Sequence, residues 1–163
     1  MPSFSTQRHV RFTADQMYAL VADVEKYPEF LPLCTGLIVL SRRSHGEGQE
    51  VTARMSVGYK SIAETFTTRV VTDPVARHIE VSYLDGPFKR LANRWSFTDD
   101  PAGCVVDFFI DYEFKSKLLG VMMGGMFDQA FRRFTQAFED RAGKIYDPPS
   151  TRITPSGQSS PSS

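Results

Sequence analysis

The sequence predicts a single α+β domain in which a curved antiparallel sheet of about seven strands wraps around a long C-terminal helix. Two observations carry this prediction. Segments of alternating apolar and polar residues, separated by short turn motifs, occupy residues 37–114, and an apolar pattern of helical period follows them. The chain of 163 residues has the length of one domain, and its 41% hydrophobic and 23% charged residues are typical of a globular protein.

The N-terminal segment is expected to hold the first strand and two short helices. Residues 4–11 have the composition of a strand. Thr13 and Gln16 have the spacing of a capping box, which predicts a helix that starts after Thr13 and ends near Asp23. The prolines of the segment 27–32 limit the next element to a single helical turn or a plain turn.

Residues 37–114 are expected to form about six strands of one sheet. The turn motifs between them are His45–Gly48, Gly58–Lys60, Asp73–Pro74, Asp85–Pro87 and Asp99–Gly103. Connections this short join antiparallel strands, because parallel strands need long crossovers. Alternation gives the sheet one apolar, aromatic face and one polar face, and the polar face carries Asp107, Asp111 and Glu113.

A long helix that runs to about Ile145 should cover the apolar face of the sheet. Its apolar residues lie mostly three or four apart: Phe127, Ala130, Phe131, Phe134, Ala137, Phe138 and Ile145. This arrangement is of the helix-grip type. Residues 1–146 should form the domain, and residues 147–163, rich in Ser, Pro and Thr, should form a disordered polar tail.

Composition and motifs argue against several functional classes. The 19 basic and 19 acidic residues give no net charge that would attract DNA. Cys34 and Cys104 lack the spacing of metal ligands and are expected to be buried thiols, so no metal site is predicted. The polar N-terminal residues lack a signal peptide's apolar core, and no apolar run is long enough to span a membrane, which indicates the cytoplasm.

The sequence contains no recognisable catalytic motif. His9, His45 and His78 are scattered, and the chain has no nucleophile elbow, P-loop or dinucleotide-binding glycine motif. The three outward carboxylates of the last strand could in principle form an acid pair or a metal site, but a solvated sheet surface is the simpler interpretation. We therefore expect a binding protein and not an enzyme.

Several motifs, in order along the chain, resemble the coenzyme Q-binding START-domain family, whose relatives include polyketide cyclases and a bacterial ribosome-association toxin. Residues 23–32 are similar to its DVExYPxFLP stretch, and Trp95-Ser96-Phe97 is similar to its WxF strand. Residues 111–120 resemble its YEFKSxLL segment, and residues 137–142 its closing AFExRA helix. The resemblance implies a START/Bet v 1-like fold with a hydrophobic cavity, no covalent cofactor, and ubiquinone or a similar isoprenoid lipid as the bound ligand.

The apolar face supplies the candidate ligand-binding residues. They are Met55, Asn93, Trp95, Phe97, Phe108, Ile110 and Tyr112 on the strands, and Met122, Met126, Phe127, Phe131 and Phe134 on the helical side. Asn93 or Tyr112 could donate a hydrogen bond to a quinone carbonyl. The alternative is that the same side chains simply fill a core.

Two segments are candidates for the entrance of the cavity. Tyr27, Pro28, Phe30 and Leu31 are expected to form one lip, and Leu118, Leu119 and Met123 the other. Residues 118–127 are uncharged and contain three glycines, so we hypothesise that they form a gate that contacts the membrane during loading, with nearby lysines at anionic headgroups. A fixed corner and a buried turn are the alternatives.

The resemblance implies a non-enzymatic carrier or chaperone of ubiquinone that supports respiration, cytoplasmic or peripheral to the inner membrane. An alternative is a ribosome-directed protein that contacts phosphates of the large subunit through Arg42, Arg43, Arg132 and Arg133. A polyketide cyclase is a weaker alternative, because such an enzyme needs positioned acid and base groups.

Overall fold

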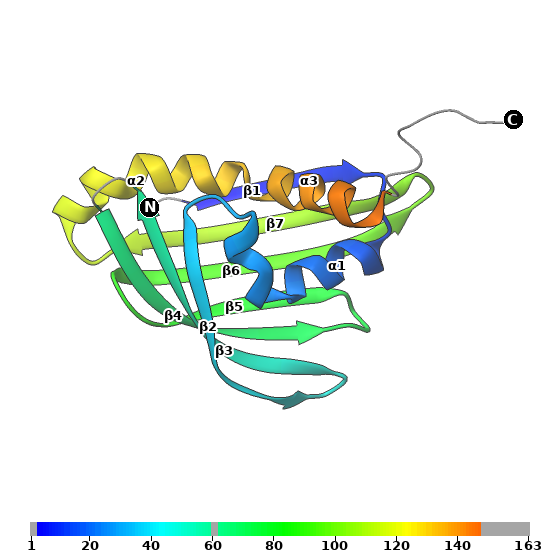
Figure 1. Ribbon diagram of the computed structural model, residues 1–163, viewed down its shortest axis with the longest axis horizontal. Coiled ribbons are helices and arrows are strands. Elements are labelled where there is room, and N and C mark those ends of the chain that lie inside the picture. The colour runs from blue at the N-terminus through cyan, green and yellow to red at the C-terminus, as the bar shows by residue number, and fades with distance from the viewer. Residues whose placement is uncertain (1–2, 60–61, 148–163) are drawn as a thin grey trace, which may run out of the picture.

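The computed structural model describes residues 3–59 and 62–147, which form a seven-stranded antiparallel sheet with helices on one of its faces (Figure 1). The strand order is β1-β7-β6-β5-β4-β3-β2, so that β1 and β2 are the edge strands. The strands are β1 (Ser3–Val10), β2 (Cys34–His45), β3 (Gly48–Tyr59), β4 (Ile62–Asp73), β5 (His78–Asp85), β6 (Phe88–Asp100) and β7 (Gly103–Phe114).

The six strands expected between residues 37 and 114 are confirmed, and each pairs with its neighbour in the sequence. The first strand, β1, pairs with the last strand, β7, and Phe4 lies opposite Ile110. The expected turn at Gly58–Lys60 lies partly outside the described residues, because β3 runs through Tyr59 and residue 60 is not described.

The two short helices after β1 are also confirmed. Helix α1 (Ala14–Ala22) begins with the capping box, in which the Thr13 hydroxyl accepts from the Gln16 amide and the Gln16 side chain accepts from the Thr13 amide. The next element, η1 (Val24–Glu29), is a 3₁₀ helix that contains Pro28. Its Tyr27 hydroxyl donates to the carbonyl of Val21, which holds η1 against α1.

The expected single C-terminal helix is in fact two helices, α2 (Lys117–Arg132) and α3 (Phe134–Tyr146). At the junction, Arg133 has a ψ of −2°, and its amide donates to the carbonyl of Ala130, three residues earlier, and to that of Phe131. The glycine-rich segment that we expected to be a gate belongs to α2, which is capped by Ser116. Apolar spacing continues across Arg133, so no local pattern indicated the break.

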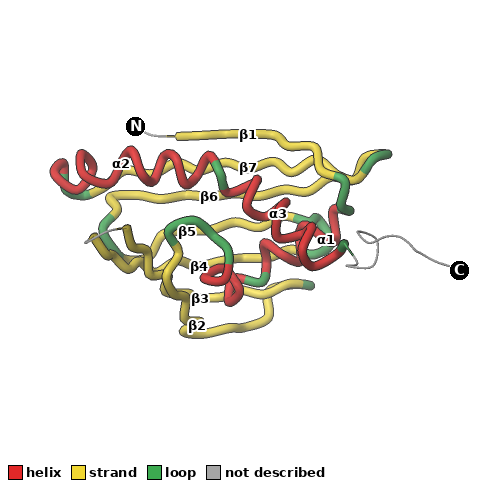
Figure 2. Tube along the Cα trace, turned by 45° about the horizontal axis from the view of Figure 1, so that its top comes forward, coloured by secondary structure: helices red, strands yellow, loops and turns green. Residues whose placement is uncertain are grey.

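All helices lie on the same face of the sheet, as the two views show (Figures 1 and 2). Helix α3 ends beside α1, where the Tyr146 hydroxyl donates to the Gln16 carbonyl at 3.1 Å. Asp147, which we expected to open the tail, pairs with Arg11 of the segment after β1. The rest of the expected tail, 148–163, lies outside the described residues.

An aromatic core joins the layers. Phe138 of α3 is fully buried, and its ring lies 5.2 Å from that of Trp95 on β6 and 5.1 Å from that of Phe30 beside η1.

Cys34 and Cys104 are buried free thiols, and burial raises the pKa of Cys104 to about 11. Within 3–59 and 62–147, no helix is both long and apolar enough to cross a membrane.

Candidate ligand cavity

The space between the sheet and the helices contains an apolar cavity of about 90 Å³. Strands β2 to β7 contribute one wall, α2 and α3 the opposite wall, and η1 with the following loop the third. Of the 22 lining residues, Thr68 and Asn93 are the polar ones besides Tyr27 and Trp95, whose rings are amphipathic. Such a concave, mostly apolar site with few polar groups is typical of a small-molecule pocket.

Seven of the predicted ligand-binding residues meet in this lining. They are Met55, Asn93, Trp95, Ile110, Phe127, Phe131 and Phe134. Tyr27 and Leu31, predicted for the entrance, also line it. Strands and helices far apart in the sequence therefore bring together the residues that alternation and helical spacing had selected one element at a time.

The other predicted residues lie elsewhere. Phe97, Phe108 and Tyr112 are buried in the core outside the lining, and Met126 packs against that core. The side chain of Met122 is exposed, because a helix that begins at Lys117 turns it away from the face that carries Phe127.

The predicted entrance residues are likewise divided. Phe30 and Pro28 do not line the cavity, and the ring of Phe30 packs on Phe138. Met123 is buried and Leu119 half-buried, whereas Leu118 is exposed.

Several lining residues were missed by sequence reasoning. Ala53 and Val57 share the strand row of Met55, and Thr68 shares the row of Phe66 and Val70, so alternation could have found them. Pro32 belongs to the segment 27–32 that we expected to form one lip. Leu33 and Leu37 carried no such signal, because Leu33 precedes β2 and a bulge between Cys34 and Gly36 interrupts the alternation before Leu37.

The side chain of Asn93 is held in one orientation by two hydrogen bonds. Its Nδ2 donates to the carbonyl of Phe109 at 2.8 Å, and its Oδ1 accepts from Nε1 of Trp95 at 3.0 Å. A carbonyl only accepts and an indole N–H only donates, so the amide cannot be flipped. One Nδ2 hydrogen and one Oδ1 lone pair remain for a ligand in the cavity.

The two tyrosines near the cavity use their hydroxyls elsewhere. Tyr27 donates to Val21, and burial raises its pKa far above the usual value. Tyr112, whose pKa burial raises to about 12, donates to the carbonyl of Gly124 at 3.5 Å. Of the two donors predicted for a ligand carbonyl, only Asn93 therefore faces the cavity.

The wall formed by residues 24–33, which we call the η1 wall, is fastened to α3. The Tyr27 and Phe30 rings pack edge-on against Phe138, at centroid distances of 5.4 and 5.1 Å. Arg141 donates to the Glu29 carboxylate at 2.5 Å and lies over the Phe30 ring. Aromatic contacts and one ion pair therefore hold this side of the cavity closed.

Leu33 at the end of the η1 wall has a backbone conformation that is unfavourable for leucine. Its φ is 68°, in the left-handed region, which costs a side-chain-bearing residue about 1–2 kcal/mol. The Leu33 carbonyl accepts from the amide of Gly58 on β3 at 3.0 Å, and its side chain lines the cavity. The strained conformation thus places an apolar side chain at the site.

Among the described residues that line the cavity, none is Asp, Glu, His, Lys, Arg or Cys. Within the described part of the chain, no group of three or more His, Cys, Asp or Glu side chains is placed to hold a metal ion. The outward carboxylates Asp111 and Glu113 instead bind Arg90, whose hydrogen bond lowers the pKa of Asp111. The cavity can enclose an apolar molecule and offer it a hydrogen bond from Asn93.

A helix-grip fold around such a cavity defines a class of ligand-binding domains, and comparisons place the chain in it. Residues 10–139 match the family described as polyketide cyclase / dehydrase and lipid transport, and the chain belongs to this family. A START superfamily protein from Mycobacterium smegmatis has the same fold, with a TM-score of 0.73 at 23% identity, over 88% of this chain and 98% of that one. The predicted START-like fold is thereby confirmed.

Two relatives have more specific names. The chain is 38% identical to the ribosome association toxin RatA of Escherichia coli K12 over 147 residues, which are 90% of each protein. It is 32% identical to the mitochondrial coenzyme Q-binding protein COQ10 homolog B of Xenopus laevis over 149 residues, which cover 88% of this chain and 59% of that protein. Both confirm the predicted family resemblance.

Proposed function

We propose that the protein binds a hydrophobic molecule with a ring carbonyl, most simply ubiquinone, and acts as its carrier or chaperone and not as an enzyme. The observation that carries the proposal is an apolar cavity in which Asn93 is fixed with a spare hydrogen-bond donor. A quinone ring matches such a site, because its faces are apolar and its carbonyls accept hydrogen bonds. The relative that is named for coenzyme Q binding supports the same choice.

The volume of the cavity supports an arrangement in which the ring lies inside and the tail outside. One water-sized group needs roughly 15 Å³ of cavity volume. The cavity of about 90 Å³ therefore holds on the order of six such groups. That space matches the six carbons of a bare ring, so the ring substituents and a long isoprenoid tail would extend beyond it. The tail would leave past the half-buried side chains of Leu33 and Leu37, where each buried CH₂ contributes about 0.8 kcal/mol.

The single tryptophan of the chain, Trp95, provides the test, because it is buried and lines the cavity. Delipidated protein is titrated with a short-tailed ubiquinone analogue and separately with an isoprenoid alcohol, with free tryptophan as the correction for absorbed light. We expect saturable, stoichiometric quenching by the quinone that competing lipid relieves. No saturable change with either ligand would leave a filled core as the better description.

The hydrogen-bond donor of Asn93, the one asparagine of the chain, can be tested by substitution. Asn93→Leu removes the donor but keeps a similar volume. Loss of one neutral hydrogen bond, worth about 1 kcal/mol, should weaken quinone binding about fivefold in calorimetry. Binding of the isoprenoid alcohol should weaken less; an equal loss for both ligands would show that Asn93 acts only through packing.

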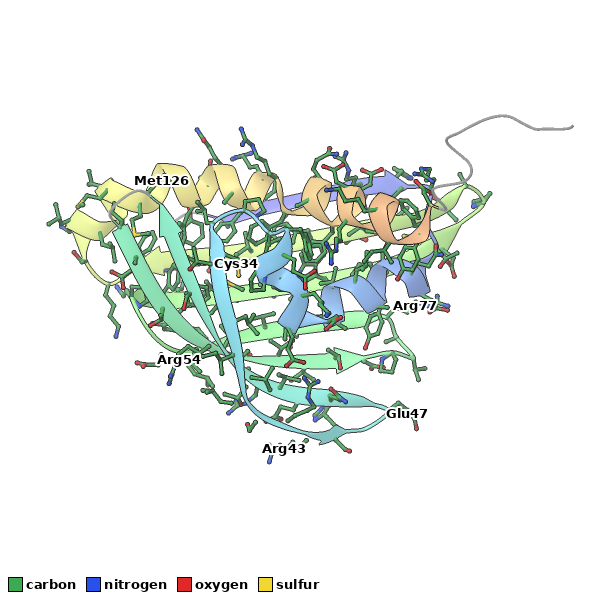
Figure 3. The ribbon with its side chains drawn as sticks, in the orientation of Figure 1. Cys34, Arg43, Glu47, Arg54, Arg77 and Met126 are labelled. Atoms are coloured by element: carbon green, nitrogen blue, oxygen red, sulfur yellow. The ribbon has the colours of Figure 1, made fainter. Side chains whose placement is uncertain are left out.

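The second candidate is association with the ribosome, which the name of the E. coli relative suggests. Of the four candidate arginines, Arg42 already pairs with Glu25, Arg43 with Glu50 and Arg132 with Asp128. Arg43 also lies on the opposite side of the molecule from α2 (Figure 3). These pairings and positions argue against one continuous cationic surface.

Co-sedimentation with the large ribosomal subunit at low and high salt tests this second candidate. Salt-sensitive binding that Arg132→Glu/Arg133→Glu weakens would support it, since phosphate contacts are screened by salt. Arg42→Glu/Arg43→Glu is the matched variant on the other surface. A cyclase activity is not favoured, because the titratable side chain in the lining is Tyr27, with its raised pKa.

A further inference from the structure

The first half of α2 exposes apolar side chains to solvent. Leu118, Val121 and Met122 are 68%, 83% and 51% exposed, and helical spacing places them on one face with Gly125. Apart from its chain neighbours and the nearby backbone of its own helix, no described atom lies within 4 Å of the position that a Cβ of Gly125 would take. We call these four residues the α2 apolar face.

This face is unusual because the opposite side of the same helix is buried. Met123, Phe127 and Phe131 pack into the core, and the last two line the cavity. A surface helix ordinarily turns charged residues to solvent opposite its buried side. Residues 118–127 contain no charge at all. Single exposed apolar residues are common, but a contiguous group on one helix face indicates an interaction surface.

Cations surround the beginning of this face. Lys115 and Lys117 are exposed directly before it, and the Lys115 amide donates to the Pro87 carbonyl at 2.9 Å. That hydrogen bond brings the β5–β6 turn and the exposed Lys89 to the same end of the molecule. Among the described residues, none of these three lysines pairs with a carboxylate. Their charges are therefore available to an anionic partner.

The chemistry of this surface matches lipid and not a folded protein. It presents exposed apolar side chains and open glycines, which adapt to a fluid apolar phase. Apolar residues flanked by lysines are the pattern by which helices lie at the interface of anionic bilayers. Figure 1 shows α2 at the top of the view, above β7 and β6.

We propose that the α2 apolar face, with Lys89, Lys115 and Lys117, docks the protein on the surface of a bilayer that contains anionic lipids. The proposal extends the proposed carrier function, because docking would place the helix that carries Phe127 and Phe131 between lipid and cavity. The surface itself is defined by exposed residues that do not line the cavity. It can therefore be tested without the ligand.

The test is flotation with quinone-free vesicles of phosphatidylcholine, with and without phosphatidylglycerol. We expect the wild-type protein to float with the anionic vesicles. Val121→Asp/Met122→Asp should lower the bound fraction at least about tenfold, because it places charge in the apolar interface. Lys115→Glu/Lys117→Glu should abolish the preference for anionic vesicles. A wild-type protein that does not float, or apolar-face variants that float like it, would overturn the proposal.

Matched controls separate the surface from general effects of charge. Val75→Asp changes the 75% exposed valine of the β4–β5 turn, and Lys144→Glu changes an exposed lysine near the end of α3. Both should float like the wild type, and a loss equal to that of the apolar-face variants would contradict the assignment.

Two further measurements keep the conclusions distinct. Val121→Asp/Met122→Asp should still bind a soluble quinone analogue in the Trp95 assay. If the wild-type protein floats but binds no quinone, the carrier proposal is refuted and the docking proposal stands. If it binds quinone but does not float, only the docking proposal is wrong. If the same variant floats normally but loses ribosome co-sedimentation, the face binds the ribosome and the bilayer proposal is wrong.

Discussion

The substitution Ala130→Leu should fill the cavity and block ligand binding while it stabilises the fold. Ala130 is a buried residue of α2 that lines the cavity beside Phe127 and Phe131. Leucine adds three carbon atoms at this position, and alanine and leucine both favour helices. The added atoms therefore enter the cavity without a penalty to the helix itself.

The magnitude follows from the cavity volume. Three methyl-sized groups at roughly 15 Å³ each take about half of the 90 Å³. Their burial contributes at most about 0.8 kcal/mol each, so the free energy of unfolding should rise by about 1–2 kcal/mol. A quinone ring that loses half its space should bind at least tenfold more weakly, a change of about 1.4 kcal/mol.

Urea denaturation measures the stability, and Trp95 quenching measures the affinity. Ala142→Leu is the control, because Ala142 is fully buried on α3 but does not line the cavity. There the same side chain overpacks the core and should cost about 1–3 kcal/mol. If Ala130→Leu destabilised the protein as much as Ala142→Leu and left quinone binding unchanged, the cavity would not be the ligand site.

Three further predictions concern the rest of the structure. Arg90 lowers the pKa of Asp111 below 3.8, so this carboxylate stabilises the fold above that pH and loses its effect as the pH falls through the lowered value. Arg90→Met should therefore flatten the acid-induced loss of stability, followed by circular dichroism. Arg141→Met releases Glu29 and should speed quinone dissociation in stopped-flow fluorescence. Leu33→Gly should weaken quinone binding but change stability by less than about 1 kcal/mol in urea denaturation, because relief of the left-handed strain offsets the lost contacts.

Each of these predictions has its own check. An unchanged acid transition in Arg90→Met would mean that the Asp111 pair adds nothing to folding. Arg132→Met removes an arginine that pairs with Asp128 on its own helix and lies over the Phe4 ring of β1. If this variant sped quinone dissociation equally, the pair of Arg141 with Glu29 would not be what holds the cavity closed. Leu37→Gly lacks strain to relieve, so it should destabilise more than Leu33→Gly; equal losses would contradict the argument.

Most of the secondary structure could be predicted because it depends on neighbours in the sequence. The capping box at Thr13 is complete within four residues, and the alternation of β3 and β7 assigns inward and outward side chains without knowledge of the rest of the chain. The number and order of the hairpins follow from short turns. The motifs at residues 23–32 and 137–142 indicated the family that the comparisons confirmed.

The site itself depended on tertiary structure. The sequence marked an apolar face, but the start of α2 at Lys117 decided that Phe127 points inward and Met122 outward. The hydrogen bond from Asn93 to Phe109 exists only in the register that joins β6 to β7. Local patterns determine which elements form and which sides are apolar, because those depend on short-range geometry. Whether an apolar side chain fills a core, lines a cavity or meets solvent depends on what long-range packing places opposite it.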